Sequence, residues 1–218
     1  MSLRIAIVGA EGTGKTTLAR DLGERLQQAT GLRTQVVSEF LREWCDREGR
    51  TPHADEQRAI AEEQGRRIEA ASLAAELIVA DTTPLMAAVY SDLRFADRSL
   101  YPFALEQQLR YDLTLFTALD LPWIADGLDR AGLQLRKPVD RALRGALLTA
   151  GIGWSLVSGS GEMRVEAALN AVTPLLTNRK TPRNGLFVRL AQRDGAQPQW
   201  RWVCEKCDVP ECEHLTGP

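Results

Sequence analysis

Apolar residues in this chain gather in short runs, and these runs are separated by longer stretches in which they recur at helical spacing. Five runs have the length and composition of buried strands. The predicted strands are Leu3–Val8, Thr34–Ser38, Glu76–Asp81, Tyr111–Phe116 and Gly153–Val157. Runs this short cannot span a membrane.

Helical patterns lie between the predicted strands. Residues 15–29 carry an apolar stripe, residues 54–75 are polar and Ala-rich, and Thr83-Pro84 is typical of a helix start. A last helix follows Gly161, with Val165 and Leu169 among the apolar residues on one face. Strands that alternate with helices predict an α/β fold, a parallel five-stranded sheet with helices on both faces.

The composition changes after Asn178. Residues 179–185 are polar and contain Pro and Gly, as in a linker. Beyond them, residues 186–191 and 200–203 flank a Gly- and Pro-containing turn, which predicts a β-hairpin. We therefore expect two units, residues 1–178 and residues 179–218.

Charge and the N-terminal segment narrow the function classes. The 218 residues include 27 Lys and Arg and 29 Asp and Glu, interspersed along the chain, so the sequence lacks the basic surface of a dedicated nucleic-acid binder. Residues 1–12 contain no apolar run long enough for a secretory signal. We expect a cytoplasmic protein without a membrane partner, in which clustered Cys bind metal more often than they form disulfides.

The strongest motif joins the first predicted strand to the first helix. Gly9-Ala-Glu-Gly-Thr-Gly-Lys-Thr16 fits the phosphate-loop pattern G-x-x-x-x-G-K-[ST] at every fixed position. Glycines let the backbone N–H groups close around phosphate oxygens, Lys15 would bridge the terminal phosphates, and the Thr16 hydroxyl would bind Mg²⁺. The candidate nucleotide-binding residues are Gly9, Glu11, Gly12, Thr13, Gly14, Lys15, Thr16 and Thr17.

Two acids follow predicted strands. Asp81 ends the third strand, where it would hold Mg²⁺ together with Thr16; the alternative is an Asp that caps the next helix. Glu39 follows the second strand, where it would bind a sugar hydroxyl or accept its proton. Arg42 would clamp substrate or phosphate, although Glu39 and Arg42 also fit a solvated pair at the start of a helix.

The segment from Asp120 to Arg136 contains a Trp, an Asp-Gly turn and several Arg, as in a lid that closes over a nucleotide. Such lids bring a guanidinium to the transferring phosphoryl group. Arg130 and Arg136 are the candidates, and a surface turn is the alternative.

The C-terminal segment holds most of the chain's soft metal ligands. Cys204, Cys207, Cys212 and His214 form C-x-x-C-x4-C-x-H, a complete tetrahedral set for a closed structural Zn²⁺ site. A catalytic zinc and a redox C-x-x-C are the alternatives. The spacing differs from that of a DNA-reading finger, although the C-terminal unit leaves nucleic-acid contact open.

Taken together, the motifs from Ile5 to about Val172 resemble those of the ribosylnicotinamide kinase domain of bifunctional NAD-biosynthesis proteins and of related NadR-like ATPases. The matching segments are residues 9–17, Glu39–Glu43, Asp81–Thr83, Tyr111–Leu115 and Trp123–Leu128. The family often has an Arg two residues after the Asp-Gly, where this chain has Asp129, with Arg130 next.

This resemblance implies a P-loop kinase fold, with ATP and Mg²⁺ as cofactors. It implies transfer of the γ-phosphate of ATP to a ribonucleoside, with nicotinamide riboside as the lead candidate. It also supports nucleotide roles for residues 14–17, a metal or catalytic role for Asp81, and substrate-side roles for Glu39 and Arg42. Two alternatives remain: a regulatory ATPase whose zinc unit docks a protein or nucleic-acid partner, and a nucleic-acid end-processing kinase with a stacking surface at Trp200 and Trp202.

Overall fold

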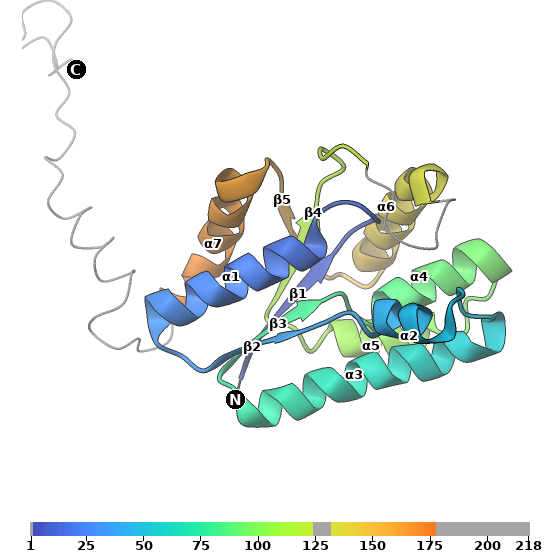
Figure 1. The fold of residues 1–218 in the computed structure, drawn as a ribbon, viewed down its shortest axis with the longest axis horizontal. Coiled ribbons are helices and arrows are strands. Elements are labelled where there is room, and N and C mark those ends of the chain that lie inside the picture. The colour runs from blue at the N-terminus through green and yellow to red at the C-terminus, as the bar shows by residue number, and fades with distance from the viewer. Residues whose placement is uncertain (1, 124–131, 178–218) are drawn as a thin grey trace, which may run out of the picture.

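A computed structural model describes residues 2–123 and 132–177 of the chain (Figure 1). Its centre is a five-stranded, wholly parallel sheet in the order β2-β3-β1-β4-β5. The strands are β1 (Leu3–Val8), β2 (Thr34–Val37), β3 (Leu77–Asp81), β4 (Leu113–Thr117) and β5 (Ser155–Val157). The predicted α/β fold with a five-stranded parallel sheet is confirmed.

Helices fill most of the chain between the strands. They are α1 (Lys15–Thr30), α2 (Phe40–Glu48), η1 (Ala54–Glu56, a short 3-10 turn), α3 (Gln57–Ala74), α4 (Pro84–Phe95), α5 (Tyr101–Gln108), α6 (Gly132–Thr149) and α7 (Gly161–Thr177). The sequence pattern predicted α1, α3, α4 and α7, but not α2, α5 or α6. Within the described residues, no helix combines the length and the apolar character needed to cross a membrane.

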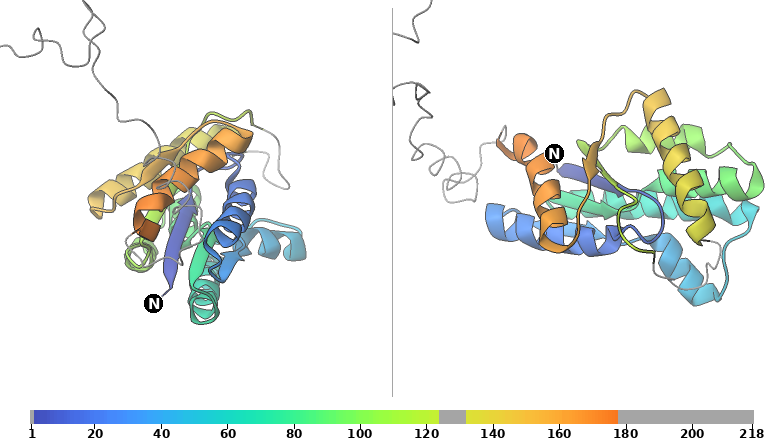
Figure 2. Two further views of the ribbon diagram at one scale, coloured as in Figure 1. Left: turned by 90° about the vertical axis from the view of Figure 1, so that its left-hand side faces the viewer. Right: turned by 90° about the horizontal axis from the view of Figure 1, so that it is seen from above.

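Alternate residues of the strands face two separate apolar layers. Ile5 and Ile7 of β1 pack with α1 and α7 on one face, and those two helices contact each other. On the other face, Ile78 of β3 packs against α3, and Phe116 of β4 packs against α4, α5 and α6 (Figure 2). Full burial of each such side chain contributes roughly 1.5–3 kcal/mol, so the two faces hold the sheet between its helices.

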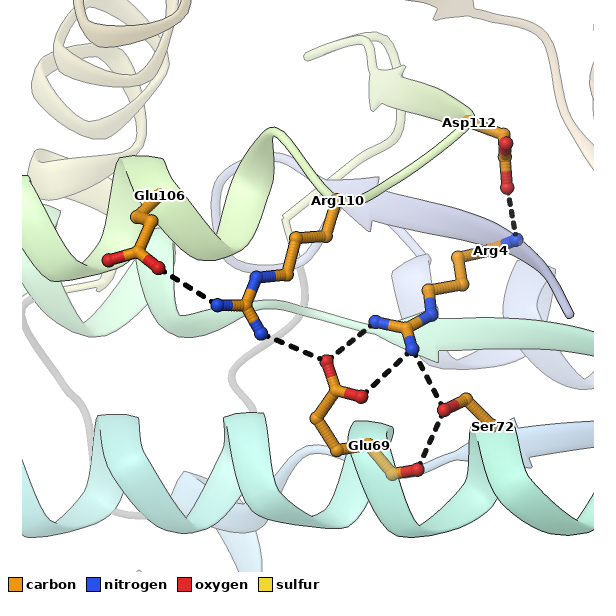
Figure 3. A network of polar contacts seen from close by, with 6 residues as sticks. All are labelled: Arg4, Glu69, Ser72, Glu106, Arg110 and Asp112. Atoms are coloured by element: carbon orange, nitrogen blue, oxygen red, sulfur yellow. Dashed lines mark hydrogen bonds and ion pairs between the residues drawn. The ribbon is translucent and has the colours of Figure 1, made fainter. Parts of the chain in front are cut away.

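A polar network closes the amino end of the sheet (Figure 3). Arg4 at the start of β1 donates two hydrogen bonds to the Glu69 carboxylate of α3, at 2.7 and 2.9 Å. Arg110 donates to the same carboxylate at 3.2 Å, and the backbone N–H of Arg4 donates to Asp112 at 2.8 Å. The network therefore ties β1 to α3 and to the start of β4. Asp112 belongs to residues 111–115, one of the segments that resemble the NadR-like family. Its hydrogen bond lies at the amino end of the sheet, opposite the phosphate loop.

The carboxyl end of the sheet is where the candidate site lies. The helix that follows β1 covers one face of the sheet, and the helix that follows β3 covers the other. Because β1 and β3 are neighbours with Ile7 paired to Asp81, the chain diverges at their ends and leaves a crevice there. The loop after β1, Glu39 (two residues after the end of β2) and Asp81 at the end of β3 all lie at this crevice.

Some of the predictions concern residues outside the described part of the chain. They are the lid arginine Arg130, the linker and hairpin in residues 179–218, and the zinc ligands Cys204, Cys207, Cys212 and His214. The division at residue 178, the zinc site and the hairpin therefore stay predictions from sequence.

Candidate nucleotide-binding site

The phosphate loop, residues 9–14, needs its glycines for two different reasons. Gly9 has φ +150°, and a Cβ there would lie 2.0 Å from the Thr117 Oγ1 atom at the end of β4. Gly12 and Gly14 have φ +63° and +74°, in the left-handed region that favours glycine. Glycine at these three positions therefore lets the loop pass close to β4 and turn into α1.

The Thr13 side chain holds the phosphate loop against the end of β4. Its hydroxyl donates to the Ala10 carbonyl at 2.7 Å and lies 2.7 Å from the Thr117 hydroxyl, and the residue is fully buried. The Thr13 side chain is therefore used inside the protein, and only its backbone is offered to a nucleotide. Thr117 was not identified from the sequence. It contacts the loop at two points, where it leaves no room for a side chain at Gly9 and where its hydroxyl meets that of Thr13.

The first turn of α1 presents positive charge and free donors. Gly14 is the N-cap and makes no side-chain cap, so the first N–H groups of α1 remain open to an anion. The Lys15 Nζ atom donates to the Ala10 carbonyl at 2.9 Å, which keeps the ammonium folded over the loop. Thr16 and Thr17 are exposed in the same turn. This arrangement suits the phosphate groups of a nucleotide.

Asp81 lies beside this turn, at the end of β3, and is 2% exposed. Burial raises the pKa of the Asp81 carboxyl, while a hydrogen bond with Thr16 and the charges of Lys15 and Arg42 act to lower it. Its Oδ1 atom is buried and has no hydrogen-bond partner in the part of the chain that the structure describes. A buried carboxylate oxygen with no partner, next to a Thr hydroxyl, fits a Mg²⁺ site.

Asp81 does not cap a helix. The N-cap of α4 is Thr83, and between them Thr82 adopts φ +71°, a strained value for a β-branched residue. Strain of this kind concentrates at functional sites. The geometry therefore does not support the alternative in which Asp81 is a capping residue.

Glu39 is the N-cap residue of α2, but its side chain makes no cap hydrogen bond. The free N–H of Phe40 is instead satisfied by the Gln64 Oε1 atom of α3 at 2.7 Å. The Glu39 side chain is 15% exposed, with one oxygen 3.8 Å from Arg42 Nε. Burial raises the pKa of Glu39, opposed most strongly by the charge of Lys15. Glu39 is thus a largely buried carboxyl at the start of α2, and the Arg42 beside it is half exposed.

Two further ionisable side chains, those of Glu11 and Tyr90, lie near Glu39 at the crevice. Tyr90 of α4 is buried and hydrogen-bonds the Glu11 side chain, and burial, followed by the charge of Glu11, raises the pKa of its phenol well above its usual value. The other oxygen of Glu11, Oε2, is buried without a partner. Glu11 was predicted as a nucleotide-site residue; Tyr90 was not, because its surroundings in the sequence read as an ordinary core helix.

Arg136 lies near the phosphate loop, on α6 rather than in a turn. Its guanidinium is largely buried, and Nη2 donates to the Leu121 carbonyl at 3.1 Å. The Leu121 side chain would be 3.1 Å from a Cβ on Gly14. Leu121 therefore contacts both Arg136 and the end of the phosphate loop. Nε of Arg136 is buried and has no hydrogen-bond partner among the described residues, so this donor could serve an added group.

The described residues contain no cluster of three or more acidic, His or Cys side chains arranged to hold a metal ion. Mg²⁺ does not need such a cluster, because it is commonly held by one or two carboxylates together with phosphate oxygens and water. Asp81 and Thr16 therefore fit a Mg²⁺ ion that arrives with the nucleotide.

A family model described as an AAA domain matches residues 4–164, which is most of the chain. The chain belongs to this AAA-domain family. Its fold is that of a nucleotide-binding P-loop kinase or ATPase, and the residues brought together at the crevice are those of the phosphate loop with Asp81 and Glu39.

Two solved structures of NadR protein share the fold. One, in complex with NR, matches with a TM-score of 0.64 and 21% identity, over 79% of this chain and 50% of that chain. The other, in complex with NAD and AMP-PNP, matches with a TM-score of 0.58 and 22% identity, over 79% and 49%. The present chain thus corresponds to about half the length of those proteins. No functionally curated protein matches it.

Proposed function

We propose that this protein is a Mg²⁺-dependent small-molecule kinase that transfers the γ-phosphate of ATP to a ribonucleoside hydroxyl, with nicotinamide riboside as the lead acceptor. The observation that carries the proposal is the pair of carboxyls beside Lys15 at the crevice, with Asp81 buried and Glu39 largely buried. A nucleotide needs the phosphate loop and one metal-binding acid. The second buried acid provides a group for an acceptor alcohol.

The residues divide into a donor side and an acceptor side. The N–H groups of the loop and of the first turn of α1 bind the phosphates, and Lys15 leaves the Ala10 carbonyl to contact them. Asp81 and Thr16 hold Mg²⁺, which supplies charge neutralisation on the phosphate oxygens when it is bound. Arg136 carries an Nε donor next to the loop that no described residue contacts by a hydrogen bond.

On the acceptor side, Glu39 orients the attacking hydroxyl and accepts its proton. The hydroxyl oxygen forms a bond to the γ-phosphorus, the bond from that phosphorus to the β–γ bridging oxygen breaks, and ADP leaves with the electron pair. Against the effect of burial, the charge of Lys15, and less strongly that of Arg42 at 3.8 Å from the Glu39 carboxylate, lowers the pKa of Glu39. Positioning and electrostatics supply most of the rate in such reactions.

A panel of nucleosides tests the proposed function. ADP release from MgATP is measured with nicotinamide riboside, its nicotinic acid analogue, the common ribonucleosides and no acceptor, and the product is identified as a nucleoside monophosphate. We expect at least one nucleoside to stimulate turnover. Binding of ATP without stimulation by any nucleoside would remove the kinase proposal, and stimulation by oligonucleotide ends would favour a nucleic-acid kinase.

Replacement of Glu39 by Gln tests the acceptor side. The carboxylate is the active form and its pKa is raised by burial, so the wild-type rate should climb with pH through a value above the usual Glu pKa of about 4.3. In Glu39→Gln the part of this acid limb that belongs to Glu39 should disappear and the part that belongs to Asp81 should remain. The kcat should fall by about a hundredfold at most, because a base contributes little to a loose transition state.

Glu43→Gln is the matched control for that substitution. Glu43 lies one turn further along α2, is exposed, and has a pKa lowered by its hydrogen bonds with Arg67. We expect its pH–rate profile to follow that of the wild type. An unchanged acid limb in Glu39→Gln, or an equal loss in both variants, would show that Glu39 does not act on the acceptor.

The alternative, a regulatory ATPase whose C-terminal unit docks a partner, depends on the predicted zinc ligands. Elemental analysis of the full-length chain should give one zinc per molecule, and Cys207→Ser should lower that content while sparing most of the turnover. A metal-free wild-type chain would eliminate the zinc unit. Equal loss of kcat in Cys207→Ser and in the phosphate-loop variants would show that the two units act as one.

A further inference from the structure

Arg164, in the first turn of α7, is a charged residue in an unfavourable place. It is 4% exposed, and a cation near a helix N-terminus is opposed by the helix dipole. A residue that contradicts its local setting in this way is held by contacts elsewhere in the fold.

Those contacts come from three separate loops. Arg164 Nη1 donates to the Gly159 carbonyl at 2.6 Å and to the Asp120 carboxylate at 2.9 Å. Nη2 donates to the Thr13 carbonyl at 2.8 Å and makes a longer contact of 3.4 Å to the Ala118 carbonyl. One guanidinium therefore joins the loop after β4, the loop after β5 and the phosphate loop.

Asp120 fixes the orientation of this guanidinium. Its second oxygen accepts the N–H of Gly159 at 2.6 Å. Burial acts to raise the pKa of Asp120, but the hydrogen bonds from Arg164 and Gly159 outweigh it and hold that pKa below its usual value. The carboxylate stays charged, and the Asp120–Arg164 pair is a rigid unit against which the phosphate loop rests.

The contact with Thr13 has a geometric consequence for phosphate binding. The peptide bonds of the described residues are trans, and in a planar trans peptide the C=O and the following N–H point in opposite directions. Because Arg164 holds the Thr13 carbonyl toward the protein interior, the N–H of Gly14 must face the other way. That is the open side of the loop, at the free N-terminus of α1.

We propose that Arg164, oriented by Asp120, is a positioning residue that aims the Gly14 N–H at the phosphates of the bound nucleotide. It acts through the Thr13–Gly14 peptide and does not touch the ligand. The inference rests on the nucleotide-binding part of the proposed function and is independent of the acceptor.

The test measures binding of a ligand that consists of phosphate alone. Affinities for Mg-tripolyphosphate and MgATP are determined by calorimetry for the wild type, Arg164→Lys and Asp120→Asn. Lysine keeps the charge but cannot reach several acceptors as a fork. We expect Arg164→Lys to weaken both ligands by a similar factor of about tenfold or more, the value of a charge-assisted hydrogen bond. Asp120→Asn should give a smaller loss in the same direction.

Glu162→Gln is the matched control. Glu162 lies in the same turn of α7 and pairs with Arg25 of α1 on the surface, so its loss disturbs the helix but not the carbonyl contacts. Both affinities should stay within about twofold of the wild type, the scale of a surface ion pair. In the ¹⁵N spectrum, the Gly14 amide signal should move on tripolyphosphate addition in the wild type and in Glu162→Gln. It should move less at saturation in Arg164→Lys.

A purely structural role for Arg164 predicts a different result. In that case Arg164→Lys and Asp120→Asn would lower the melting temperature and leave both affinities and the Gly14 shift unchanged, which would overturn the proposal. If Arg164→Lys does not fold, Asp120→Asn decides by the same criteria. Loss of phosphate affinity in a protein that no nucleoside stimulates would sustain this inference and remove only the kinase proposal.

Discussion

Replacement of Lys15 by Ala should abolish measurable phosphoryl transfer while leaving the protein folded. Lys15 is the cation nearest to the developing charge on the phosphates, and loss of one preorganised donor of this kind lowers kcat by about 10²–10³. The fold should persist because the Ala10 carbonyl, which Lys15 contacts in the free loop, also accepts the Thr13 hydroxyl at 2.7 Å. Initial rates of ADP formation with the best acceptor provide the measurement.

Lys137→Ala is a suitable control for this variant. Lys137 lies on α6, away from the phosphate loop, so its removal changes the net charge by the same amount without affecting the crevice. Its turnover should equal that of the wild type, and circular dichroism should be the same for all three proteins. Turnover in Lys15→Ala above about a tenth of the wild-type rate would show that Lys15 does not stabilise the transferring group.

The contribution of Lys15 also extends to the acids around it. Its charge lowers the pKa of both Glu39 and Asp81 against the effect of burial. Without it, both carboxyls should take up protons at higher pH, and any residual activity should have its acid limb shifted upward. The site thus behaves as one coupled set of charges, in which the phosphate-binding cation also prepares the acids for their roles.

Local signals explain which parts of the fold were predictable. The phosphate loop is a contiguous motif between a strand and a helix. Strand β1 is an apolar run interrupted only by Arg4, and β3 is an apolar run that ends in Asp81. The fourth strand was predicted to begin at Tyr111, two residues before the observed Leu113. Tyr111 is apolar in sequence, yet its N–H bonds back to the Gln108 carbonyl at 3.3 Å, so the residue still belongs to the turn after α5.

The missed helices depend on contacts or residues that the pattern does not reveal. The first N–H of α2 is capped by Gln64, 24 residues further along the chain. Helix α5 is only 8 residues long and begins beside a proline. Helix α6 contains Pro138, which ordinarily argues against a helix. The lid prediction for Arg136 rested instead on the Trp, the Asp-Gly turn and the arginines between Asp120 and Arg136.

In the candidate site too, some residues can be identified from local sequence patterns and others cannot. Lys15 and Asp81 could be found because a motif and a strand end identify them. Arg164 could not, because its importance comes from a contact with Thr13, 151 residues away in sequence. Thr117 is likewise an ordinary strand residue until Gly9 and Thr13 are seen to pack on it. Sequence motifs identify the residues proposed to contact the ligand. The residues that position them can be identified only from contacts in the folded structure.

Replacement of Asp81 by Asn should have opposite effects on activity and on stability. The variant keeps the shape of the side chain but loses the charge that holds Mg²⁺, so kcat should fall by about 10²–10³. Stabilisation of the protein by MgATP should fall with it, since the metal would lose the carboxylate at the end of β3. A thermal-shift titration with MgATP measures both the ligand-free protein and the increment.

The ligand-free variant should be more stable than the wild type near neutral pH. The folded-state pKa of Asp81 is raised above its unfolded value because burial penalises the charged form. Such a group contributes stability below its unfolded pKa, and that contribution is lost as the pH rises through the folded pKa. Above its folded-state pKa, Asp81 of the wild type is a buried, ionised carboxylate with one oxygen that no described residue contacts by a hydrogen bond, and the neutral amide of the Asp81→Asn variant avoids that cost.

The melting temperature reports the sign of this effect. Each kcal/mol gained corresponds to about 2–4 °C for a domain of this size, and the difference between Asp81→Asn and the wild type should shrink as the pH falls toward about 4, the ordinary pKa of an Asp. Asp92→Asn is the control, because Asp92 lies on α4 and pairs with the exposed Arg98. A ligand-free Asp81→Asn protein that melts below the wild type near neutral pH would mean that the carboxylate is a structural partner, and the assignment of its free oxygen to Mg²⁺ would be wrong.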